Sequence, residues 1–444
     1  MMFRAASKKS GLCRVIKNLC LSSVIAVTVL PPAAGAATAL APAASTSVGN
    51  VTTAPLSVLL QRDLEARAQA AKDKGGKPPA LSPPRGVKAI PRHDRPPPIQ
   101  QRPAGPDPFV QKKKTLNRPE LGLTAMPATG QNFEGQYNIY DVLPPDTNGD
   151  VGPHHYVQMV NISISVYDKT GTKLLGPVAS NVLWQTLGGL CASNNDGDPV
   201  VLYDQNADRW LISQFALGFP NDFHECVAIS QTGDPTGAWH LYDFLASTAD
   251  MNDYPKLGIW PDGYYMSAND FSGANKQWSG ASVYAFERNK MLQGLPAQMV
   301  KFKIPTTTNI YGLLPADWDG ATPPPGGSPN PFVFLRSTQQ GDTTTGLEIW
   351  NFHVDWTTPV NSTFNFVVNL PSPFDEDMCG WARTCIPQPG GSSLDAISDR
   401  LMFRNQYRNF GSHQAMVLNH TVDSTGTDVA GVRWYELTKS LSRN

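Results

Sequence analysis

The sequence predicts an all-β protein whose main domain is a β-propeller of five four-stranded blades. From residue 146 onward the chain repeats one phrase about five times: an acidic or glycine-rich turn, a strand, a short turn, a second strand ending in small polar residues, and an aromatic outer strand. The 39 Pro and 37 Gly supply turns for many short strands, and only 16% of the residues are charged. Repeats of this size indicate propellers or related arrays.

The repeat divides the chain into units that are each long enough for one blade. In chain order the units cover residues 146–184, 198–244, 253–304, 314–368 and 393–437. In the last unit the innermost strand is expected at residues 393–397. Because propellers close by radial repetition of four-stranded blades, we expect the units to surround a central channel. Two stacked sheets are the alternative architecture.

The N-terminus has the order of a secretory signal over residues 1–36. A basic stretch is followed by an apolar run at residues 19–30 and by small residues that end at Ala36, where cleavage is expected. The apolar run is too short for a membrane-spanning helix, which needs about 20 residues. Export to the extracellular space or periplasm is therefore favoured over a membrane anchor, and no membrane span is expected.

A linker separates this signal from the repeats. Residues 37–130 are rich in Ala, Pro, Lys and Arg and lack the apolar periodicity that would repay the entropy of ordering. They are predicted to be a disordered linker or pro-segment, with one short helix near residues 57–74. Residues 131–444 are predicted to form the propeller domain.

The net charge bears on the class of partner, and the cysteines bear on the redox compartment. The formal net charge of −1 gives no reason to propose nucleic acid as the partner. Four cysteines remain after the signal, and four cysteines allow three pairings. We expect Cys379 to pair with Cys385 and Cys191 with Cys226, in an oxidising compartment. A four-cysteine zinc site is the alternative, but the sequence has no Cys-x-x-Cys pair.

Acidic residues precede the innermost strand of each unit. By the repeat alignment they are Asp146, Asp198, Asp253, Asp317 or Asp319, and Asp395. In a propeller the innermost strands begin at the mouth of the central channel, so these side chains are expected to converge. Carboxylates so close together cannot all ionise without a cation or raised pKa values, because like charges disfavour each other.

Glycoside hydrolysis is one chemistry that such a ring supports, because it uses one ionised and one protonated carboxyl group. The predicted architecture resembles the five-bladed propellers of the arabinanase, inulinase and levansucrase clans, in blade number and in the placement of carboxylates. The resemblance implies Asp146 as base or nucleophile, Asp198 as an orienting carboxylate, and Asp253 or Glu225 as the acid.

Aromatic and cationic side chains are candidates for holding a glycan. The aromatic candidates, which would stack on sugar rings, are Tyr254, Trp260, Trp278 and Trp318. Packing in the core is the alternative role of each Trp. The cationic candidates, which would hold the carboxylate of an acidic sugar, are Arg404, Arg408, His413 and His420. Pairing with the ring of aspartates is their alternative role.

Calcium is the second candidate for the acidic loops. Two short oxygen-rich turns are the candidate sites, one with Asp146, Asn148 and Asp150 and the other with Asn194, Asp196 and Asp198. Hard cations take six to eight oxygen ligands, and such spacing offers three of them from one turn. Neither turn is an EF-hand loop, because the twelfth position is Val157 in one and Gln205 in the other.

Four phrases resemble a widespread family of bacterial exported proteins. They lie at residues 143–158, 251–267, 398–404 and 419–423, and the similarity spans about residues 132–437. The resemblance implies export and a propeller, and its members are often joined to surface or adhesion modules. Two hypotheses follow: a secreted enzyme that cleaves glycans, and a non-enzymatic carbohydrate-binding or adhesion propeller with a structural Ca²⁺. The sequence gives no oligomeric state.

Overall fold

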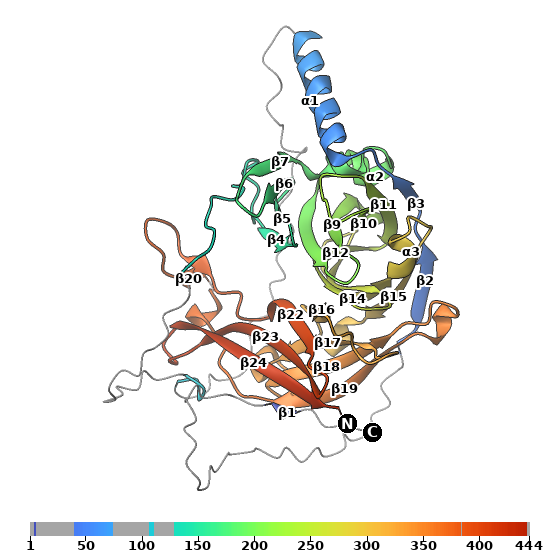
Figure 1. Cartoon of the computed structure of the whole chain (residues 1–444). Helices are drawn as coiled ribbons and strands as arrows, with labels where there is room; N and C mark the ends of the chain where they lie inside the picture. The colour runs from blue at the N-terminus through green and yellow to red at the C-terminus, as the bar shows by residue number, and fades with distance from the viewer. Residues whose placement is uncertain (1–3, 6–39, 74–105, 111–127, 383, 442–444) are drawn as a thin grey trace.

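The chain folds into antiparallel β-sheets with a few short helices (Figure 1). The computed structural model describes residues 4–5, 40–73, 106–110, 128–382 and 384–441. The prediction of an all-β fold is confirmed. The predicted signal at residues 1–36 lies outside the described residues, except that β1 (Arg4–Ala5) pairs with the last strand, β24.

The described strands form successive antiparallel meanders, which we number in chain order. The first meander consists of β4 (Asn148–Val151), β5 (His155–Val160), β6 (Ser163–Asp168) and β7 (Lys173–Ala179). The second consists of β8 (Gly197–Asp204), β9 (Arg209–Gly218), β10 (Asp222–Ser230) and β11 (Trp239–Ser247). The third consists of β12 (Asp250–Ile259), β13 (Tyr264–Ser272), β14 (Trp278–Phe286) and β15 (Gln298–Ile304).

Two further meanders complete the sheets. The fourth consists of β16 (Leu314–Asp319), β17 (Asn330–Arg336), β18 (Gly346–His353) and β19 (Thr363–Pro371). The fifth consists of β22 (Met402–Asn409), β23 (His413–Asp423) and β24 (Ala430–Ser440). Short elements lie between the strands: η1 (Ser180–Trp184), α2 (Gly189–Ser193), α3 (Arg288–Met291), η2 (Thr306–Thr308), η3 (Thr338–Gln340), η4 (Pro359–Asn361), η5 (Cys379–Trp381), β20 (Thr384–Ile386) and β21 (Leu394–Asp395).

The first strands of the meanders meet one after another. β4 contacts β8, β8 contacts β12, β12 contacts β16, and β16 pairs in parallel with β22 in the register Ala316↔Asn405. The Arg404 guanidinium on β22 then lies 3.4 Å from a carboxylate oxygen of Asp150 on β4. This contact brings the last meander back to the first, so residues far apart in the sequence share one centre.

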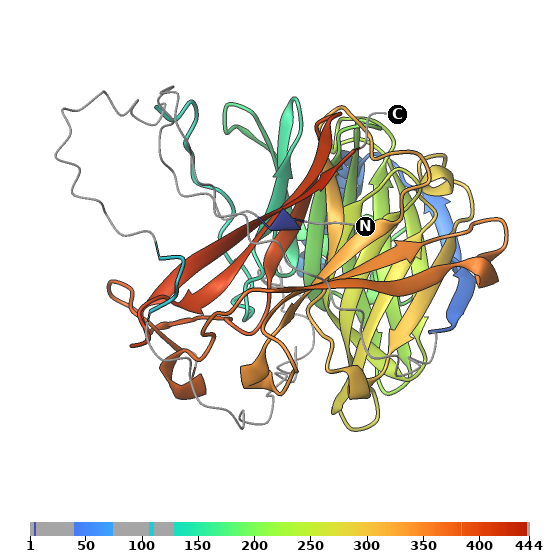
Figure 2. The ribbon, with the colours of Figure 1, turned by 90° about the horizontal axis from the view of Figure 1, so that it is seen from below.

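Apolar side chains fill the space between neighbouring meanders, because successive side chains of a strand point to opposite faces of its sheet. One core cluster joins the first and second meanders around Trp184 and Trp210. A second joins the second and third meanders around Tyr242 and Tyr264. The largest, with Phe332 among its buried rings, joins the third, fourth and fifth. The second and third meanders lie side by side in both views (Figures 1 and 2).

Within residues 37–130, predicted to be a linker with one short helix, the structure adds two strands that the sequence did not predict. β2 (Pro42–Thr46) pairs with β15, and β3 (Gly49–Thr52) pairs with β11, so the segment adds an outer strand to two meanders. Helix α1 (Leu56–Asp73) follows, close to the helix predicted near residues 57–74, and stands out from the body (Figure 1). The outer strand of a sheet offers unpaired N–H and C=O groups, to which an extended segment of any composition can pair.

The last unit also differs from expectation. Its innermost strand is β22, and not residues 393–397, because β22 pairs directly with the innermost strand of the fourth meander. Leu394–Asp395 instead forms the two-residue strand β21, which pairs with β20. The fifth meander therefore has three strands of its own, β22 to β24.

Both predicted disulfides are present. Cys191 in α2 bonds to Cys226 in β10, and Cys379 bonds to Cys385. The first ties a helix between two meanders to a central strand of the second meander. Among the described residues no helix is both long and apolar enough to cross a membrane.

Candidate active site

Three of the predicted carboxyl groups meet where the first three meanders begin. Asp146 precedes β4, Asp198 lies at the start of β8, and Asp253 lies near the start of β12. The carboxylates of Asp253 and Asp146 both act on the pKa of Asp198, and Asp146 is within hydrogen-bonding reach of Asp198. All three residues are partly exposed. We call Asp146, Asp198 and Asp253 the carboxylate cluster.

Local backbone distortions point these side chains toward one another. The backbone is left-handed at Asp146 (φ 41°), at Asp198 (φ 49°) and at Tyr254 (φ 55°). The strand register also shifts between Gly197 and Val200 in β8, a step that includes Asp198, and between Asp253 and Lys256 in β12. Left-handed non-glycine residues are uncommon, and an irregularity of this kind re-aims a side chain out of the regular ladder. Backbone segments with uncommon conformations thus position these carboxyl groups.

Asn161, in the turn between β5 and β6, connects two members of the cluster. Its Nδ2 donates to Oδ2 of Asp146 at 2.8 Å and to the carbonyl of Pro144 at 3.0 Å. Its Oδ1 accepts the backbone N–H of Asp198 at 3.0 Å. Asn161 is buried, with 3% of its surface exposed. One amide group therefore fixes the first carboxylate relative to the backbone of the second.

Burial and mutual repulsion raise the pKa values within the cluster. The pKa of Asp198 is raised well above its usual value, first by burial and then by the Asp253 and Asp146 carboxylates. Burial also raises the pKa of Asp253 to about 7, although the Arg400 and Lys256 cations oppose that rise. Groups that interact this strongly titrate together. Protonated carboxyl groups are therefore available near neutral pH.

Tyr254 completes the site together with two cations, Lys256 and Arg400, that the sequence did not assign. The backbone N–H of Tyr254 donates to Oδ2 of Asp198 at 3.0 Å. The Lys256 ammonium lies 3.6 Å from the centre of the Tyr254 ring, and the Arg400 guanidinium carbon lies 5.1 Å from it. Arg400 also forms a salt bridge with Asp399 at 2.8 Å. Of these residues only Tyr254 was a candidate, as a platform for a sugar ring.

Asp317, Asp150 and Arg404 form a second charged group further along the first strands. Arg404 Nη1 lies 2.6 Å from Oδ2 of Asp317 and 3.4 Å from Oδ2 of Asp150. Burial raises the pKa of Asp317 to about 7, against the effect of Arg404. Asp317 Oδ1 accepts the backbone N–H of Ile259 at 2.9 Å, and Asp150 Oδ2 accepts that of Tyr203 at 2.9 Å. These two carboxylates therefore link neighbouring first strands. Arg404 pairs with aspartates, which is the alternative role given for it in the sequence analysis.

Glu225, the other candidate acid, lies on β10 and is fully buried between the second and third meanders. Its Oε2 accepts a hydrogen bond from Nδ2 of Asn252 at 2.9 Å. Burial raises its pKa to about 8, against the opposing effects of Ser213 and Asn252. The structure does not bring Glu225 into the carboxylate cluster, because the third strand of a meander lies away from the centre.

The candidate tryptophans pack into the core. Trp260 is 2% exposed and its indole N–H donates to the carbonyl of Ser328 at 2.8 Å. Trp318 is 7% exposed and donates to the carbonyl of Thr322 at 3.0 Å. Trp278 packs edge-on against Phe271. The structure therefore supports the alternative role for Trp260 and Trp318.

Two of the cationic candidates in the last unit also lie apart from the cluster. His420 is fully buried, its ring stacks on Tyr435, and its Nε2 is 2.9 Å from the Tyr435 hydroxyl. Burial and Arg433 lower the pKa of His420 to about 3. Arg408 is exposed, with its guanidinium carbon 5.4 Å from the centre of the Phe410 ring. Neither side chain is brought to Asp198 or its neighbours.

In the two turns predicted to bind Ca²⁺, side-chain oxygens accept hydrogen bonds from backbone N–H groups of neighbouring strands. Asn148 Oδ1 accepts the backbone N–H of Val201 at 2.7 Å, and Asp196 Oδ2 accepts that of Leu217 at 2.7 Å. In the described parts of the chain no group of three or more His, Cys, Asp or Glu side chains is placed to hold a metal ion. One oxygen of Asn148 and one of Asp196 are therefore engaged by backbone N–H groups, and binding of Ca²⁺ at these turns stays a prediction.

Comparison with known proteins finds no family model and no curated protein that matches this chain. Among solved structures it is similar to a subtype N11 neuraminidase-like protein of A/flat-faced bat/Peru/033/2010, with 8% identity over 67% of this chain and 74% of that one and a TM-score of 0.34. It is similar to an α-L-arabinanase of Cellvibrio cellulosa complexed with arabinohexaose, with 12% identity over 65% of this chain and 90% of that one and a TM-score of 0.29. It is also similar to a GH43_1 enzyme of Xanthomonas citri, with 10% identity over 68% of this chain and 88% of that one and a TM-score of 0.29. Similarity this distant carries no argument about function.

Proposed function

We propose that this chain is a secreted β-propeller of five blades that hydrolyses glycosidic bonds with its carboxylate cluster. One observation carries the proposal: three carboxyl groups from three successive meanders meet at a partly exposed centre, with the pKa of two of them raised. Glycoside hydrolysis needs such a pair, in which one carboxyl group is protonated and the other is ionised.

The surroundings of each carboxyl group support different roles. Asn161 donates a hydrogen bond to Asp146 and fixes the orientation of its carboxylate, which suits a base or nucleophile. Asp253, whose pKa is about 7, is the acid that gives its proton to the departing sugar oxygen. Asp198 lies between them, within hydrogen-bonding reach of Asp146, and orients that carboxylate.

The five-bladed form of the propeller rests on the meanders. Their first strands contact one another in chain order, and Arg404 reaches Asp150 across the remaining gap. The core clusters lie between the first and second, the second and third, and the third and fourth meanders, as face-to-face blades require, whereas the fourth and fifth meanders are hydrogen-bonded edge to edge in one sheet. Secretion is supported by the two disulfides, which persist in oxidising compartments.

A propeller that binds glycans without cleaving them is the second candidate. It is favoured by the backbone contacts of the central carboxylates: Asp150, Asp198 and Asp317 each accept an N–H from a neighbouring first strand. In that role the carboxylates hold the blades in register, and a cation such as Ca²⁺ adds stability without taking part in turnover.

The deciding experiment incubates the full chain with a panel of plant and bacterial polysaccharides and measures released reducing ends, with and without a chelator. We expect release from at least one polysaccharide, unaffected by the chelator and abolished in Asp198→Asn. Asp141→Asn is the matched control, because Asp141 is also left-handed but is exposed outside the cluster. If no polysaccharide releases sugar and the chelator lowers the melting temperature, the hydrolase proposal fails and the binding propeller stands.

A further inference from the structure

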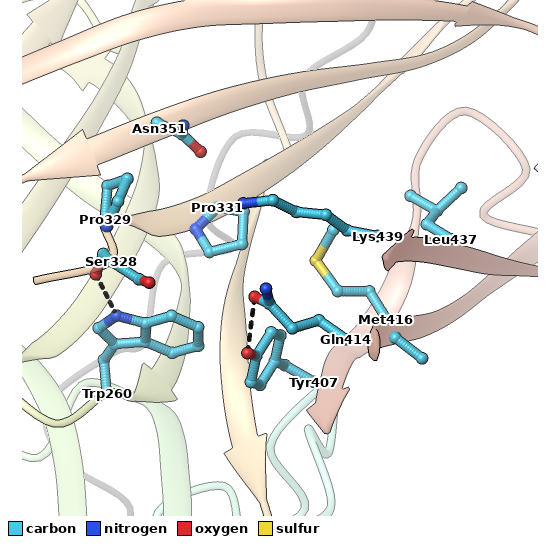
Figure 3. Close-up of a pocket in the computed structure, with 11 residues that line it drawn as sticks. Trp260, Ser328, Pro329, Pro331, Asn351, Tyr407, Gln414, Met416, Leu437 and Lys439 are labelled. Atoms are coloured by element: carbon cyan, nitrogen blue, oxygen red, sulfur yellow. Dashed lines mark hydrogen bonds between the residues drawn. The ribbon is translucent and has the colours of Figure 1, made fainter. Parts of the chain in front are cut away.

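A small cavity lies between the fourth and fifth meanders, next to the end of β12 (Figure 3). Its volume is about 50 Å³. On the same measure roughly 10–15 Å³ holds one water molecule, so the cavity has room for a ligand of a few non-hydrogen atoms. The lining residues are Trp260, Ser328, Pro329, Pro331, Asn351, Tyr407, Gln414, Ala415, Met416, Leu437 and Lys439.

The strand register explains why polar and apolar groups face this cavity together. In the antiparallel pair of β23 and β24, Gln414 lies opposite Lys439 and Met416 lies opposite Leu437. Residues directly opposite each other, and residues two apart on one strand, project from the same face of a sheet. Four side chains of the fifth meander are thus presented to the fourth meander as one surface.

The wall of the cavity is mostly apolar. The Trp260 and Tyr407 rings meet edge to face with their centres 4.7 Å apart. Pro331 and Met416 face each other across the remaining space (Figure 3). The indole N–H of Trp260 is already used on the carbonyl of Ser328 at 2.8 Å, so this ring offers only its apolar surface. Ligand sites typically combine such walls with a small number of placed polar groups.

Gln414 supplies the first of those polar groups. The Tyr407 hydroxyl donates to Oε1 of Gln414 at 2.8 Å, which fixes the orientation of the amide and leaves Nε2 as the free end. Gln414 is only 7% exposed, and its Nε2 is buried with no hydrogen-bond partner among the described residues. A buried donor without a partner costs free energy, and an acceptor supplied by a ligand would remove that cost.

Lys439 supplies the second polar group. Its side chain extends over the cavity toward Pro331, above the Gln414 amide (Figure 3). No carboxylate of the described residues forms an ion pair with it. Burial lowers its pKa, as expected for an ammonium that lacks a partner. An anionic acceptor in the cavity would compensate that charge.

This cavity is distinct from the carboxylate cluster. Asp253 lies near the start of β12, whereas Trp260 follows its last residue, Ile259. At about 3.3 Å per residue the seven steps between them span roughly 20 Å. No residue that lines the cavity belongs to the carboxylate cluster.

We propose that this cavity binds a short-chain carboxylate, whose oxygens accept from Lys439 and from Nε2 of Gln414 and whose alkyl end packs against Met416 and Trp260. Both donors belong to the fifth meander, and apolar groups of the same face and of the facing elements, Met416 and Trp260, line the rest of the cavity, which suits a molecule with one charged end. A carboxylate takes up charge-assisted hydrogen bonds, which are stronger than those of a neutral acceptor.

The test measures binding of propionate to the full chain by titration calorimetry and by saturation-transfer NMR. We expect saturable binding in the millimolar range, which a ligand of so few atoms allows. Propionamide has the same shape without the charge and should bind at least tenfold more weakly. Lys439→Gln should weaken propionate binding about tenfold or more, and Gln414→Leu several-fold.

Two further variants show whether folding or the site is responsible. Lys439→Arg keeps the charge and should retain most of the binding, whereas Lys173→Gln, at an exposed position of β7, should change nothing. The melting temperature of each variant is recorded alongside. Failure of propionate to bind the wild type saturably, or equal binding by Lys439→Gln, would overturn the proposal. Neither result depends on whether the carboxylate cluster is catalytic.

Discussion

Asn161 donates from Nδ2 to Oδ2 of Asp146 at 2.8 Å. Because the same side chain also accepts the backbone N–H of Asp198 at 3.0 Å, a turn of the first meander holds two carboxyl groups that belong to different meanders. The geometry of the carboxylate cluster therefore depends on the neutral side-chain amide of Asn161. Its removal is a direct way to loosen the site.

Asn161→Ala should destabilise the protein by about 1–3 kcal/mol, because it leaves the backbone N–H of Asp198 buried without its acceptor. Urea unfolding of the full chain measures this change. Asn275→Ala is the control, since Asn275 is exposed and its Oδ1 accepts only a local N–H, that of Gln277. A loss no larger than that of the control would show that Asn161 does not hold the two loops together.

The pKa of Asp253 predicts how stability depends on pH. An Asp in an unfolded chain has a pKa near 3.9, whereas burial raises the pKa of Asp253 to about 7. The folded state therefore binds this proton more tightly, and the stability that the group contributes declines as the pH rises from about 4 to about 7.

Asp253→Asn stays neutral at every pH and should be more stable than the wild type above pH 7, by about 1–2 kcal/mol once solvent screening of a partly exposed group is allowed for. Near pH 4.5 the two proteins should melt at similar temperatures. Thermal unfolding across this range measures the difference. A variant less stable than the wild type at pH 8 would contradict the raised pKa.

His224 predicts a loss of stability with rising pH at another place, in a higher pH range than for Asp253. Its Nδ1 lies 2.5 Å from Asp243 and its Nε2 lies 2.8 Å from Asp222. Burial lowers the pKa of His224, but the two carboxylates outweigh it and the pKa is raised. The stabilisation is therefore complete below about pH 6.5, the unfolded value, and is lost as the pH rises through the folded pKa.

His224→Gln should lower the melting temperature at pH 6 and have a smaller effect at pH 9. His154→Gln is the control, because His154 is exposed. Equal effects of His224→Gln at both pH values would mean that the two aspartates do not hold a protonated imidazole.

Arg404 closes the ring of first strands by pairing with Asp317 at 2.6 Å and Asp150 at 3.4 Å. Arg404→Met leaves both carboxylates without their cation and should cost about 3–5 kcal/mol, the range for breaking a buried ion pair. Arg404→Lys should recover part of that loss. Urea unfolding tests both, with Arg62→Met on the exposed side of α1 as control. A cost below about 1 kcal/mol would show that this contact does not close the ring.

The repeat alignment identified the three members of the carboxylate cluster, although Asp317 and Asp395, which it also placed at the centre, lie elsewhere. Asp146, Asp198 and Asp253 occupy equivalent places in three units, and the structure brings them together because each stands where a first strand begins. Glu225 had no such support: only the resemblance to the five-bladed hydrolases implied it, and its position on a third strand places it between two meanders. Position within the repeat was thus a better guide than residue type.

Other features left no signal in the sequence. β2 and β3 are short outer strands, rich in small and polar residues, whose register comes from their partners, so no alternation marks them. Lys256 and Arg400 reach the cluster from a strand and a loop that are adjacent only after folding. β22 pairs in parallel with β16, a strand far from it in the sequence, so no local sequence pattern predicts this pairing.

The proposed acid gives the most direct test of the central claim. A general acid typically contributes 10²–10⁴-fold to the rate, and only where the leaving group needs a proton. Turnover of Asp253→Asn is therefore compared on the polysaccharide that the wild type cleaves and on an aryl glycoside of the same sugar with a dinitrophenolate leaving group. We predict a loss of at least about 100-fold on the polysaccharide and a much smaller loss on the aryl glycoside. Equal losses on both substrates, or no loss on either, would contradict the assignment of Asp253 as the acid of the carboxylate cluster.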